Sequence, residues 1–242
     1  MKKVAKKLSS ESDLDLKEAA KIILAGGVVA LPFNGIYGFF GNIESKEVAD
    51  RIIEIKKRPK DRNLIIVSAP EFIDEYVNLT GGSYYSKDSL MSLWRDLHAL
   101  GVILPAGQKA PFHLRSGSRK ETVLSIWTEY PPLRKVMDCF RSLGGKAFVG
   151  TSANHSGNAA HFRTHSLWEE FGESVDAIVE ADFQKIDKDR HKSTTILDLT
   201  NSQPILHRLG NVDKTELKKA LKKNLLPSFV ESSRLILVQT GE

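Results

Sequence analysis

The sequence predicts an α/β fold in which helices flank a mixed sheet. Short apolar runs rich in β-branched residues alternate with amphipathic segments at helical spacing along most of the 242 residues. The composition, 41% hydrophobic and 27% charged, is typical of a globular protein with a substantial core, and it excludes disordered and collagen-like chains. No internal repeat and no linker rich in Pro, Gly or Ser divides the chain, so we expect one domain.

The first elements are predicted from capping residues and periodicity. Asp15 followed by Glu18 resembles a capping box that begins a helix, and the pair Gly26-Gly27 ends it. A strand over 28–31 follows. Ser45 is expected to cap a second helix. The buried face of that second helix carries Val48, Ala49, Ile52 and Ile55.

The rest of the chain continues the alternation. Further helices are expected over 70–79, 86–100, 131–143, 166–171 and 214–224. Further strands are expected over 64–67, 102–104, 123–127, 147–151, 177–179, 195–199 and 205–208. The segment 228–242 fits either an added strand or a loose tail.

Cysteine content and hydropathy indicate a cytoplasmic protein. Cys139 is the single cysteine, so no intramolecular disulfide can form, as is typical of reducing compartments. The apolar runs around 22–31 and 64–67 are shorter than the roughly 18 residues that a membrane-spanning helix needs, and no membrane span is expected. The basic start is followed by polar residues rather than by the apolar segment of a signal peptide.

Positive charge is concentrated over residues 56–62. Five of these seven residues are Lys or Arg, in a chain of formal charge +5, which suits a nucleic acid or polyphosphate partner. Pro59 disfavours helix at the residue before it, so Lys56 and Arg58 are expected to project from an irregular segment into the main cavity. Alanine at either position should then weaken polyanion binding and leave the fold nearly intact. A solvated charge cluster is the alternative, as it is for the lysine-rich helix over 214–224.

Two polar segments follow predicted strands. Residues 31–38 are interpreted as a strand running into a glycine-punctuated loop that allows close approach of a ligand. Residues 150–157 place hydroxyl and amide side chains after an apolar strand, where ligands of α/β sheets often bind, and Ser152 and Asn154 are expected to face the cavity that Lys56 lines. The alternatives are a simple turn and a polar turn that caps its own backbone. No metal site is expected, because His161 and His165 lack the further ligands of a zinc signature.

These motifs, in this order, resemble those of the YrdC-like family of threonylcarbamoyl-AMP synthases. The resemblance covers about residues 15–213, which leaves a basic and polar segment over 1–14 and a basic helix and tail over 214–242. Its most specific part is the Ser-Ala-Asn-x-Ser-Gly run that begins at Ser152, supported by the Lys-x-Arg-Pro run that begins at Lys56. The motifs are Gly26-Gly27-Val28-Val29-Ala30-Leu31-Pro32, Tyr37-Gly38, Lys56-x-Arg58-Pro59, Thr151-Ser152-Ala153-Asn154-His155-Ser156-Gly157, Ser193-Thr194-Thr195-Ile196-Leu197-Asp198 and Arg208-x-Gly210.

The resemblance implies a twisted mixed sheet with flanking helices around a concave, positively charged cavity. It also implies a reaction, in which ATP with Mg²⁺ as substrate, bicarbonate and L-threonine give threonylcarbamoyl-adenylate and pyrophosphate, and the product serves to modify adenosine in tRNA. The expected partners are therefore ATP, bicarbonate and an amino acid, with tRNA or double-stranded RNA as a further partner.

Site residues follow from the matching motif positions. The catalytic and nucleotide-binding positions are Lys56, Arg58, Ser152 and Asn154, and physically two cations would offset phosphate charge while the polar pair holds carbamate or phosphate oxygens. Thr195 and Arg208 match positions on the nucleotide side. The substrate loop comprises Pro32, Phe33, Asn34 and Tyr37.

Three departures from the family pattern leave alternatives open. The stretch Phe33-Asn34-Gly35 replaces Thr-acid-Thr, Trp94-Arg95-Asp96-Leu97-His98 replaces Trp-Pro-Gly-Pro and a hydroxyl residue, and Ile126 stands in place of a strand arginine. We therefore expect poor threonine binding and an altered amino acid or acyl acceptor. One alternative is a catalytically impaired relative that binds RNA or nucleotide through its basic cavity. The other is a scaffold whose cavity is filled by Phe33, Phe39 and Trp127.

Overall fold

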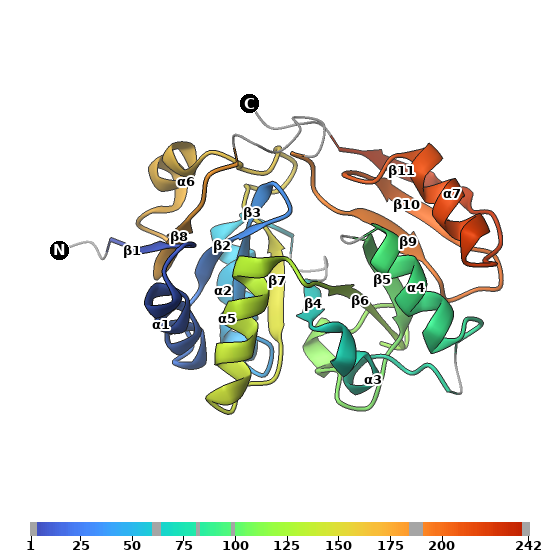
Figure 1. Cartoon of the computed structure of the whole chain (residues 1–242), viewed down its shortest axis with the longest axis horizontal. Coiled ribbons are helices and arrows are strands. Elements are labelled where there is room, and N and C mark those ends of the chain that lie inside the picture. Colours follow the sequence, from blue (N-terminus) through green and yellow to red (C-terminus); the bar gives the residue numbers. More distant parts are fainter. Residues whose placement is uncertain (1–3, 60–63, 81–82, 98–99, 184–190, 239–242) are drawn as a thin grey trace. The chain divides into compact units, whose positions relative to one another are not determined.

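The computed structural model describes residues 4–59, 64–80, 83–97, 100–183 and 191–238, and the chain forms two compact units (Figure 1). The first unit comprises Met1–Leu64, Glu129–Lys192 and Thr240–Glu242. The second comprises Ile65–Thr128 and Ser193–Gln239. The single domain over 15–213, with flanking segments over 1–14 and 214–242, stays a prediction.

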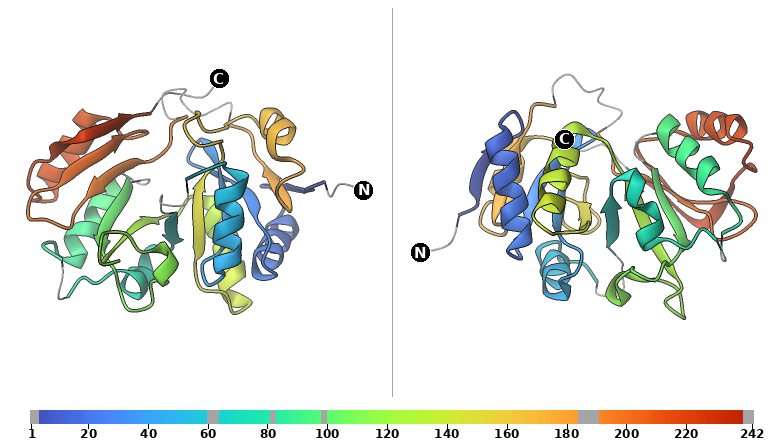
Figure 2. Two further views of the ribbon diagram at one scale, coloured as in Figure 1. Left: turned by 180° about the vertical axis from the view of Figure 1, so that it is seen from behind. Right: turned by 60° about the horizontal axis from the view of Figure 1, so that its bottom comes forward.

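The first unit is built on a mixed sheet with the strand order β1-β8-β2-β3-β7. β1 and β8 are parallel, as are β8 and β2, whereas β3 is antiparallel to both β2 and β7. Helices α1 and α5 pack together on one face and α2 lies on the other (Figures 1 and 2). The strands are β1 (Lys6–Ser9), β2 (Val29–Phe33), β3 (Ile36–Asn42), β7 (Phe148–Ser152) and β8 (Ala177–Glu180). The helices are α1 (Asp13–Leu24), α2 (Lys46–Ile55), α5 (Pro131–Ser142) and α6 (Thr164–Phe171).

The caps of the first two helices test the predicted starts. Ser45 caps α2 as expected, and its hydroxyl accepts the N–H of Val48. The capping box at Asp15 is wrong, because α1 begins two residues earlier and Ser12 is its N-cap. The Ser12 hydroxyl accepts the Asp15 N–H, while the Asp15 carboxylate accepts the N–H of Ser9 and so joins the first turn of α1 to the end of β1.

The predicted glycine-punctuated loop over 31–38 is wrong, because these residues form a tight β-hairpin. Phe33 pairs with Ile36 and Pro32 pairs with Tyr37. Asn34 and Gly35 form the two-residue turn, with φ angles of 45° and 89°. Positive φ at both positions is what a type I′ hairpin turn requires, and the dipeptide Asn-Gly is the sequence best suited to it.

The strands of the second unit follow the order β4-β6-β5-β9-β10-β11, with both parallel and antiparallel neighbours. Helix α7 packs against α4, where Asp96 accepts hydrogen bonds from Lys223 at 2.5 Å and from Asn224 at 2.8 Å. The strands are β4 (Ile65–Ser68), β5 (Leu100–Pro105), β6 (Thr122–Trp127), β9 (Thr195–Asp198), β10 (Ile205–Leu209) and β11 (Val230–Leu237). The helices are α3 (Ile73–Tyr76), α4 (Lys87–Leu97), α7 (Lys214–Lys223) and the 3₁₀ turns η1 (Pro70–Phe72) and η2 (Phe112–Leu114).

Several other elements differ from the sequence predictions. The helix over 70–79 is only a 3₁₀ turn followed by the short α3, and the helix over 86–100 ends at Leu97, before β5 begins. Strands β1 and β3 were not predicted. β11 confirms the strand alternative for the C-terminal segment. In the described part of the chain, no helix has both the length and the apolar character needed to span a membrane.

Candidate functional site

Lys56 occupies the C-cap of α2, and the residues after it close the helix by their own backbone. Lys57 adopts φ 50°, its N–H donates to Glu54 O at 2.9 Å, and the N–H of Arg58 donates to Ile53 O at 3.0 Å. These two bonds form a Schellman motif. The expectation that Pro59 breaks the helix is therefore wrong, because the left-handed residue Lys57 ends it first.

The Lys56 ammonium is buried and held by three oxygen atoms. It donates to Ser152 O at 2.5 Å, Asn154 O at 2.8 Å and Asn154 Oδ1 at 2.9 Å, and the residue is 3% exposed. An ammonium has three N–H donors, so these contacts match its donor capacity. Lys56 therefore does not project from an irregular segment as expected, but its side chain lies against the second motif, as the resemblance implies.

Ser152 and Asn154 are tied both to Lys56 and to their own turn. Ser152, the last residue of β7, donates its hydroxyl proton to Asn154 Oδ1 at 2.6 Å. The Asn154 amide donates to His155 O at 2.9 Å and to Asn158 O at 2.6 Å. The Asn154 amide group thus caps the backbone of its own turn, as the alternative interpretation expects, while its Oδ1 atom accepts from the Lys56 ammonium.

Arg58 joins the same group of residues. Its Nη1 lies 3.4 Å from the hydroxyl of Thr151, which precedes Ser152 on β7, and its side chain is half-buried. A backbone bond from Ser156 N–H to Lys56 O, 2.8 Å long, adds a further link. The four residues predicted as catalytic therefore come together in the first unit, with two cations at the end of one strand. Lys60 and Arg62, the other cations of the basic cluster, lie outside the described residues.

The predicted substrate-loop residues are mostly buried in the hairpin. Tyr37 is fully buried, and its hydroxyl bonds Thr164 Oγ1 at 2.7 Å and accepts the N–H of Ala181 at 3.0 Å. Burial raises the pKa of the Tyr37 hydroxyl above its usual value. Pro32 and Phe33 are also buried. Asn34 at the turn is the partly exposed member, and the assignment of these four residues to a substrate loop stays a prediction.

Thr195 and Arg208 belong to the second unit, and each is engaged with backbone there. The Thr195 hydroxyl donates to Val212 O at 2.8 Å and accepts the N–H groups of Gly210 at 2.9 Å and Val212 at 3.1 Å. The one donor and the two lone pairs of this hydroxyl are then used within the turn, and the match of Thr195 to a nucleotide-side position stays a prediction. Arg208 Nε donates to Thr194 O at 2.7 Å and so supports the same turn.

Two of the sequence departures lie within the second unit. In the first, Trp94 keeps the family's tryptophan, is 4% exposed and donates its indole N–H to Trp127 O, whereas Arg95, which stands in place of a proline, is exposed. Ile126 is 2% exposed, so an apolar side chain fills the place where the resemblance implies a guanidinium. His98 lies outside the described residues.

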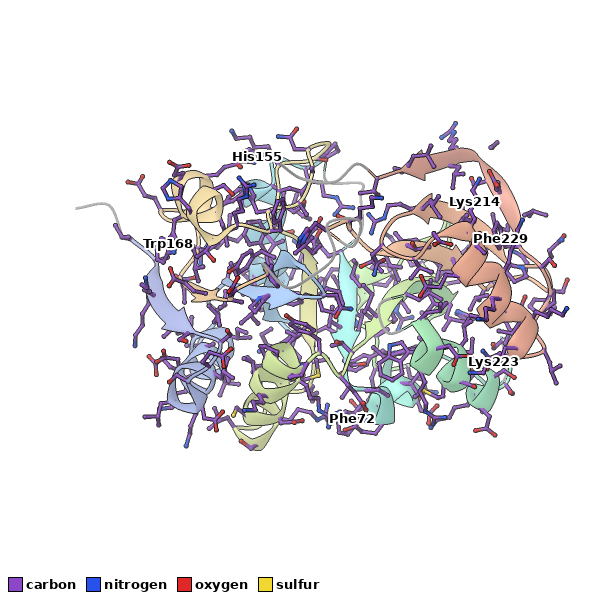
Figure 3. All side chains as sticks on the ribbon, turned by 45° about the horizontal axis from the view of Figure 1, so that its top comes forward. Phe72, His155, Trp168, Lys214, Lys223 and Phe229 are labelled. Atoms are coloured by element: carbon purple, nitrogen blue, oxygen red, sulfur yellow. The ribbon has the colours of Figure 1, made fainter. Side chains whose placement is uncertain are left out.

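The lysines of α7 favour the solvated-face interpretation, because Lys214 pairs with Glu231 at 2.7 Å and Lys223 with Asp96 at 2.5 Å, near the two ends of the helix (Figure 3).

Sequence reasoning missed the polar contacts of the histidines near the motif. His161 hydrogen-bonds Glu170, His155 Nε2 lies 3.1 Å from the same carboxylate, and His191 Nδ1 lies 2.5 Å from Gly35 O in the hairpin turn. The His191 ring stacks on Phe162 with centroids 4.3 Å apart. No spacing rule would have found these contacts, because they join distant segments.

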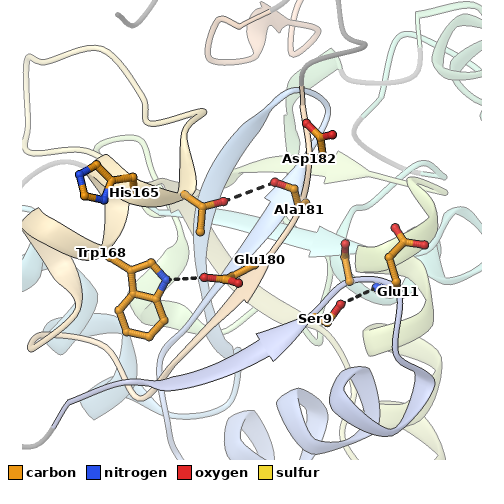
Figure 4. A pocket seen from close by; sticks show the side chains of 9 residues that line it. Ser9, Glu11, His165, Trp168, Glu180, Ala181 and Asp182 are labelled. Carbon is orange, nitrogen blue, oxygen red and sulfur yellow. Dashed lines mark hydrogen bonds between the residues drawn. The ribbon is translucent and has the colours of Figure 1, made fainter.

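A polar pocket of about 550 Å³ lies at the ends of β1 and β8 beside the start of α6 (Figure 4). Trp168 Nε1 donates to Glu180 Oε1 at 2.9 Å on its wall, and Glu11 and Asp182 also line it. No predicted site residue is among its lining residues. Its carboxylates make it unlike the expected positively charged cavity, which stays a prediction.

Comparison with known proteins decides the family. The family model Sua5_yciO_yrdC, described as "Telomere recombination", matches residues 21–210. The chain belongs to the Sua5/YciO/YrdC family. The YrdC-like resemblance is thereby confirmed. A curated relative from Vibrio campbellii named threonylcarbamoyl-AMP synthase is 25% identical over 190 residues, covering 78% of this chain and 96% of the relative. One of the same name from Nitrosococcus oceani is 29% identical over 161 residues, covering 66% of this chain and 82% of the relative.

Solved structures of this family share the fold. P. abyssi Sua5 complexed with L-threonine matches with a TM-score of 0.77 at 22% identity over 96% of this chain, and this chain spans 66% of that protein. E. coli YciO matches with a TM-score of 0.71 at 19% identity, over 88% of this chain and 98% of that one. The α/β fold with a mixed sheet and flanking helices is confirmed.

Proposed function

We propose that the protein is an ATP-using synthase of the threonylcarbamoyl-adenylate type. In this reaction the amine of an amino acid combines with bicarbonate to give a carbamate and water. A carbamate oxygen then attacks the α-phosphate of ATP and pyrophosphate leaves. The observation that carries the proposal is the meeting of Lys56 and Arg58 with the Ser152–Asn154 loop, since both motifs are those of the family.

The two cations have different parts in this proposal. The three N–H donors of the Lys56 ammonium bind three protein oxygens, so Lys56 holds the loop in place and contributes positive potential at the end of β7. Arg58 is only half-buried, and its planar guanidinium suits a bidentate contact with a phosphate or carboxylate group. The Ser152 hydroxyl donates its proton to Asn154, so its lone pairs are left to accept a hydrogen bond from an O–H or N–H group of the substrate.

Mg²⁺ enters this proposal as part of the MgATP substrate. No group of three or more His, Cys, Asp or Glu side chains among the described residues is placed to hold a metal ion. Metal binding through the nucleotide phosphates is the usual mode for Mg²⁺, which keeps several water ligands. The protein side chains then need only to hold the phosphates.

The amino acid acceptor is proposed to differ from threonine. At the place of the family's Thr-acid-Thr stretch, Phe33 is 7% exposed with its ring edge-on to Tyr130 at 6.4 Å, and Asn34-Gly35 form the turn. No hydroxyl is offered there to a small polar amino acid. The P. abyssi Sua5 structure holds L-threonine, so its named ligand is the natural reference compound.

The relatives support the wider setting of the proposal. Those named threonylcarbamoyl-AMP synthase cover most of this chain at about a quarter identity. We propose by analogy a role in tRNA adenosine modification, in the cytoplasm, with tRNA or double-stranded RNA as a further partner.

A second candidate function is binding of nucleotide or RNA without turnover. The observation that favours it is the loss of polar groups at two family positions, where Phe33 and Ile126 are buried. A missing guanidinium removes a charge-assisted contact that transition-state stabilisation would use. In this case the basic side chains around Arg58 would bind polyanions and no adenylate would form.

One experiment separates the two candidates. The protein is incubated with MgATP, bicarbonate and each of the twenty amino acids, and mass spectrometry detects carbamoyl-adenylates. The synthase proposal predicts an adduct with at least one amino acid other than threonine, and its loss in Arg58→Met. Binding of MgATP without any adduct would support the second candidate and overturn the first.

A further inference from the structure

Glu170 on α6 is shared by two histidines from different parts of the chain. Its Oε1 lies 3.1 Å from His155 Nε2, and its Oε2 lies 2.5 Å from His161 Nε2. Both rings pack edge-on against Phe171, with centroids 5.0 Å and 5.6 Å away, and Phe171 is 1% exposed. Each carboxylate oxygen therefore lies next to one imidazole Nε2, beside a buried aromatic ring.

The second nitrogen of His161 continues the network. Nδ1 lies 2.9 Å from Ser166 Oγ, and the Ser166 hydroxyl donates to Arg163 O at 3.1 Å. Both ring nitrogens of His161 are therefore engaged, Nδ1 with the Ser166 hydroxyl and Nε2 with the Glu170 carboxylate. The orientation of the ring is fixed from both sides.

One of the two histidines belongs to the motif loop and the other follows it. His155 is inside the Ser152–Gly157 run, directly after Asn154. His161 closes the segment that follows, since its N–H donates to Ala153 O at 3.0 Å and its carbonyl accepts the N–H of Tyr37 at 2.7 Å. A single side chain of α6 thus contacts the loop that holds the Lys56 ammonium at His155 and the segment after that loop at His161.

We propose that Glu170 is a positioning residue for the nucleotide site, acting through His155 and His161 on Asn154. The effect of Glu170 on nucleotide binding rests on the proposed function, whereas its effect on the conformation of the loop does not. Asn154 must present Oδ1 to Lys56 and to Ser152 while its amide holds two carbonyls. The network at Glu170 keeps the turn in the one arrangement that allows all of these bonds.

Native-state hydrogen exchange tests the structural part. The probes are the amides of Ser156, which donates to Lys56 O, and Ala153, which donates to Tyr37 O. In Glu170→Ala we expect both amides to exchange about tenfold faster or more, with Glu170→Gln in between because its amide keeps one acceptor. The Ile43 amide, bonded to Ala147 O in the same unit, serves as the reference and should stay unchanged.

Glu169→Ala provides the matched control. Glu169 is the neighbouring residue on α6, it is exposed, and it pairs with the exposed His165 at 3.1 Å. Unchanged exchange at Ser156 in Glu170→Ala would overturn the proposal, because it would mean that Glu170 does not hold the loop in place. Equal acceleration at Ile43 would also overturn it, because it would mean that the whole unit is destabilised.

MgATP titration by calorimetry, well below the unfolding temperature, tests the positioning part. Glu170→Ala should bind MgATP about tenfold more weakly than Glu169→Ala or wild type. Wild-type affinity in Glu170→Ala would overturn the positioning role even if exchange is faster. Absence of MgATP binding in the wild-type protein would instead refute the proposed function and the positioning role together, and exchange would still decide whether Glu170 fastens the loop.

Discussion

Lys56 Nζ lies 2.9 Å from Asn154 Oδ1, although the two residues are 98 positions apart in the chain. The bond joins the C-terminal end of α2 to the loop after β7, so the two family motifs form one structural unit. Because the ammonium is buried, this contact stabilises the fold as well as shaping the site. The expectation that alanine at Lys56 would leave the fold nearly intact is therefore revised.

Replacing Lys56 by methionine should lower the free energy of unfolding by about 2 kcal/mol. Methionine fills the space but removes the donor from the Ser152 and Asn154 carbonyls, and it leaves Asn154 Oδ1 with the Ser152 hydroxyl alone. Removing a buried charge is favourable and offsets part of this loss. Arg58→Met, at a half-buried position, should cost well below 1 kcal/mol, because surface changes usually have small effects. Urea unfolding measures both. Equal destabilisation by the two variants would contradict the assigned difference.

Replacing Lys57 by glycine should stabilise the protein by about 0.5 kcal/mol. Lys57 sits at φ 50°, which costs a residue with a Cβ atom about 1 kcal/mol, and the greater freedom of glycine in the unfolded chain offsets part of the gain. Glu54→Gly, at an exposed position inside α2, is the control and should destabilise by about 1 kcal/mol. Thermal unfolding would refute the Schellman interpretation if both variants lost stability.

Replacing Gly210 by alanine should disrupt the turn that carries Thr195 and Arg208. A Cβ atom at Gly210 would lie 1.8 Å from Ser193 O, a backbone atom that cannot move aside cheaply. We expect a loss of about 3 kcal/mol or more, as is typical of forced overpacking. Gly101→Ala on β5 is the control, because its Cβ would meet neighbours at an ordinary 3.4 Å. Similar unfolding midpoints for the two variants would be inconsistent with this packing.

Tyr85 should make the stability of the protein fall at alkaline pH. Its hydroxyl donates to Asn201 O at 2.8 Å and Ser202 O at 2.9 Å, and burial together with the Asp198 carboxylate raises its pKa from 10 to about 12. The unfolded chain loses this proton from pH 10, whereas the folded chain keeps it to about pH 12, so stability is lost as the pH rises through this window. Tyr85→Phe should be less stable than wild type at pH 8, and the gap should narrow by pH 11. A gap in unfolding free energy that stays constant over this range would count against the assignment.

The sequence predicted those elements whose signals are local. Ser45 was found because a hydroxyl three residues before a buried apolar position is a direct capping signal. Strand β3 was missed because its glycines, Gly38 and Gly41, resemble a loop, although Asn34-Gly35 is a hairpin signal. The structure explains Gly41, since a Cβ atom there would lie 2.2 Å from Val48 Cγ1 of α2. That close packing of helix on strand is not visible in local periodicity.

Most of the features that were missed depend on contacts between distant parts of the chain. β1 is four residues long and pairs with β8, far along the chain, so its alternation is too short to detect. The motif residues were found through the family resemblance, whereas Glu170 matched no motif. The depth of Lys56 was misjudged because a run of basic residues usually lies on the surface, and here one member is buried against backbone carbonyls.

The central claim is that the motifs beginning at Lys56 and at Ser152 together form a nucleotide site. Calorimetric titration of MgATP tests this claim on the wild-type protein, Ser152→Ala and Thr200→Ala. Thr200 lies in the second unit and bonds to the neighbouring Asp198, so it is a threonine outside the proposed machinery. We expect binding in wild type and Thr200→Ala, about tenfold weaker binding in Ser152→Ala, and little threonine-dependent pyrophosphate release in a parallel assay. Equal MgATP affinity in all three proteins, or brisk turnover with threonine, would contradict it.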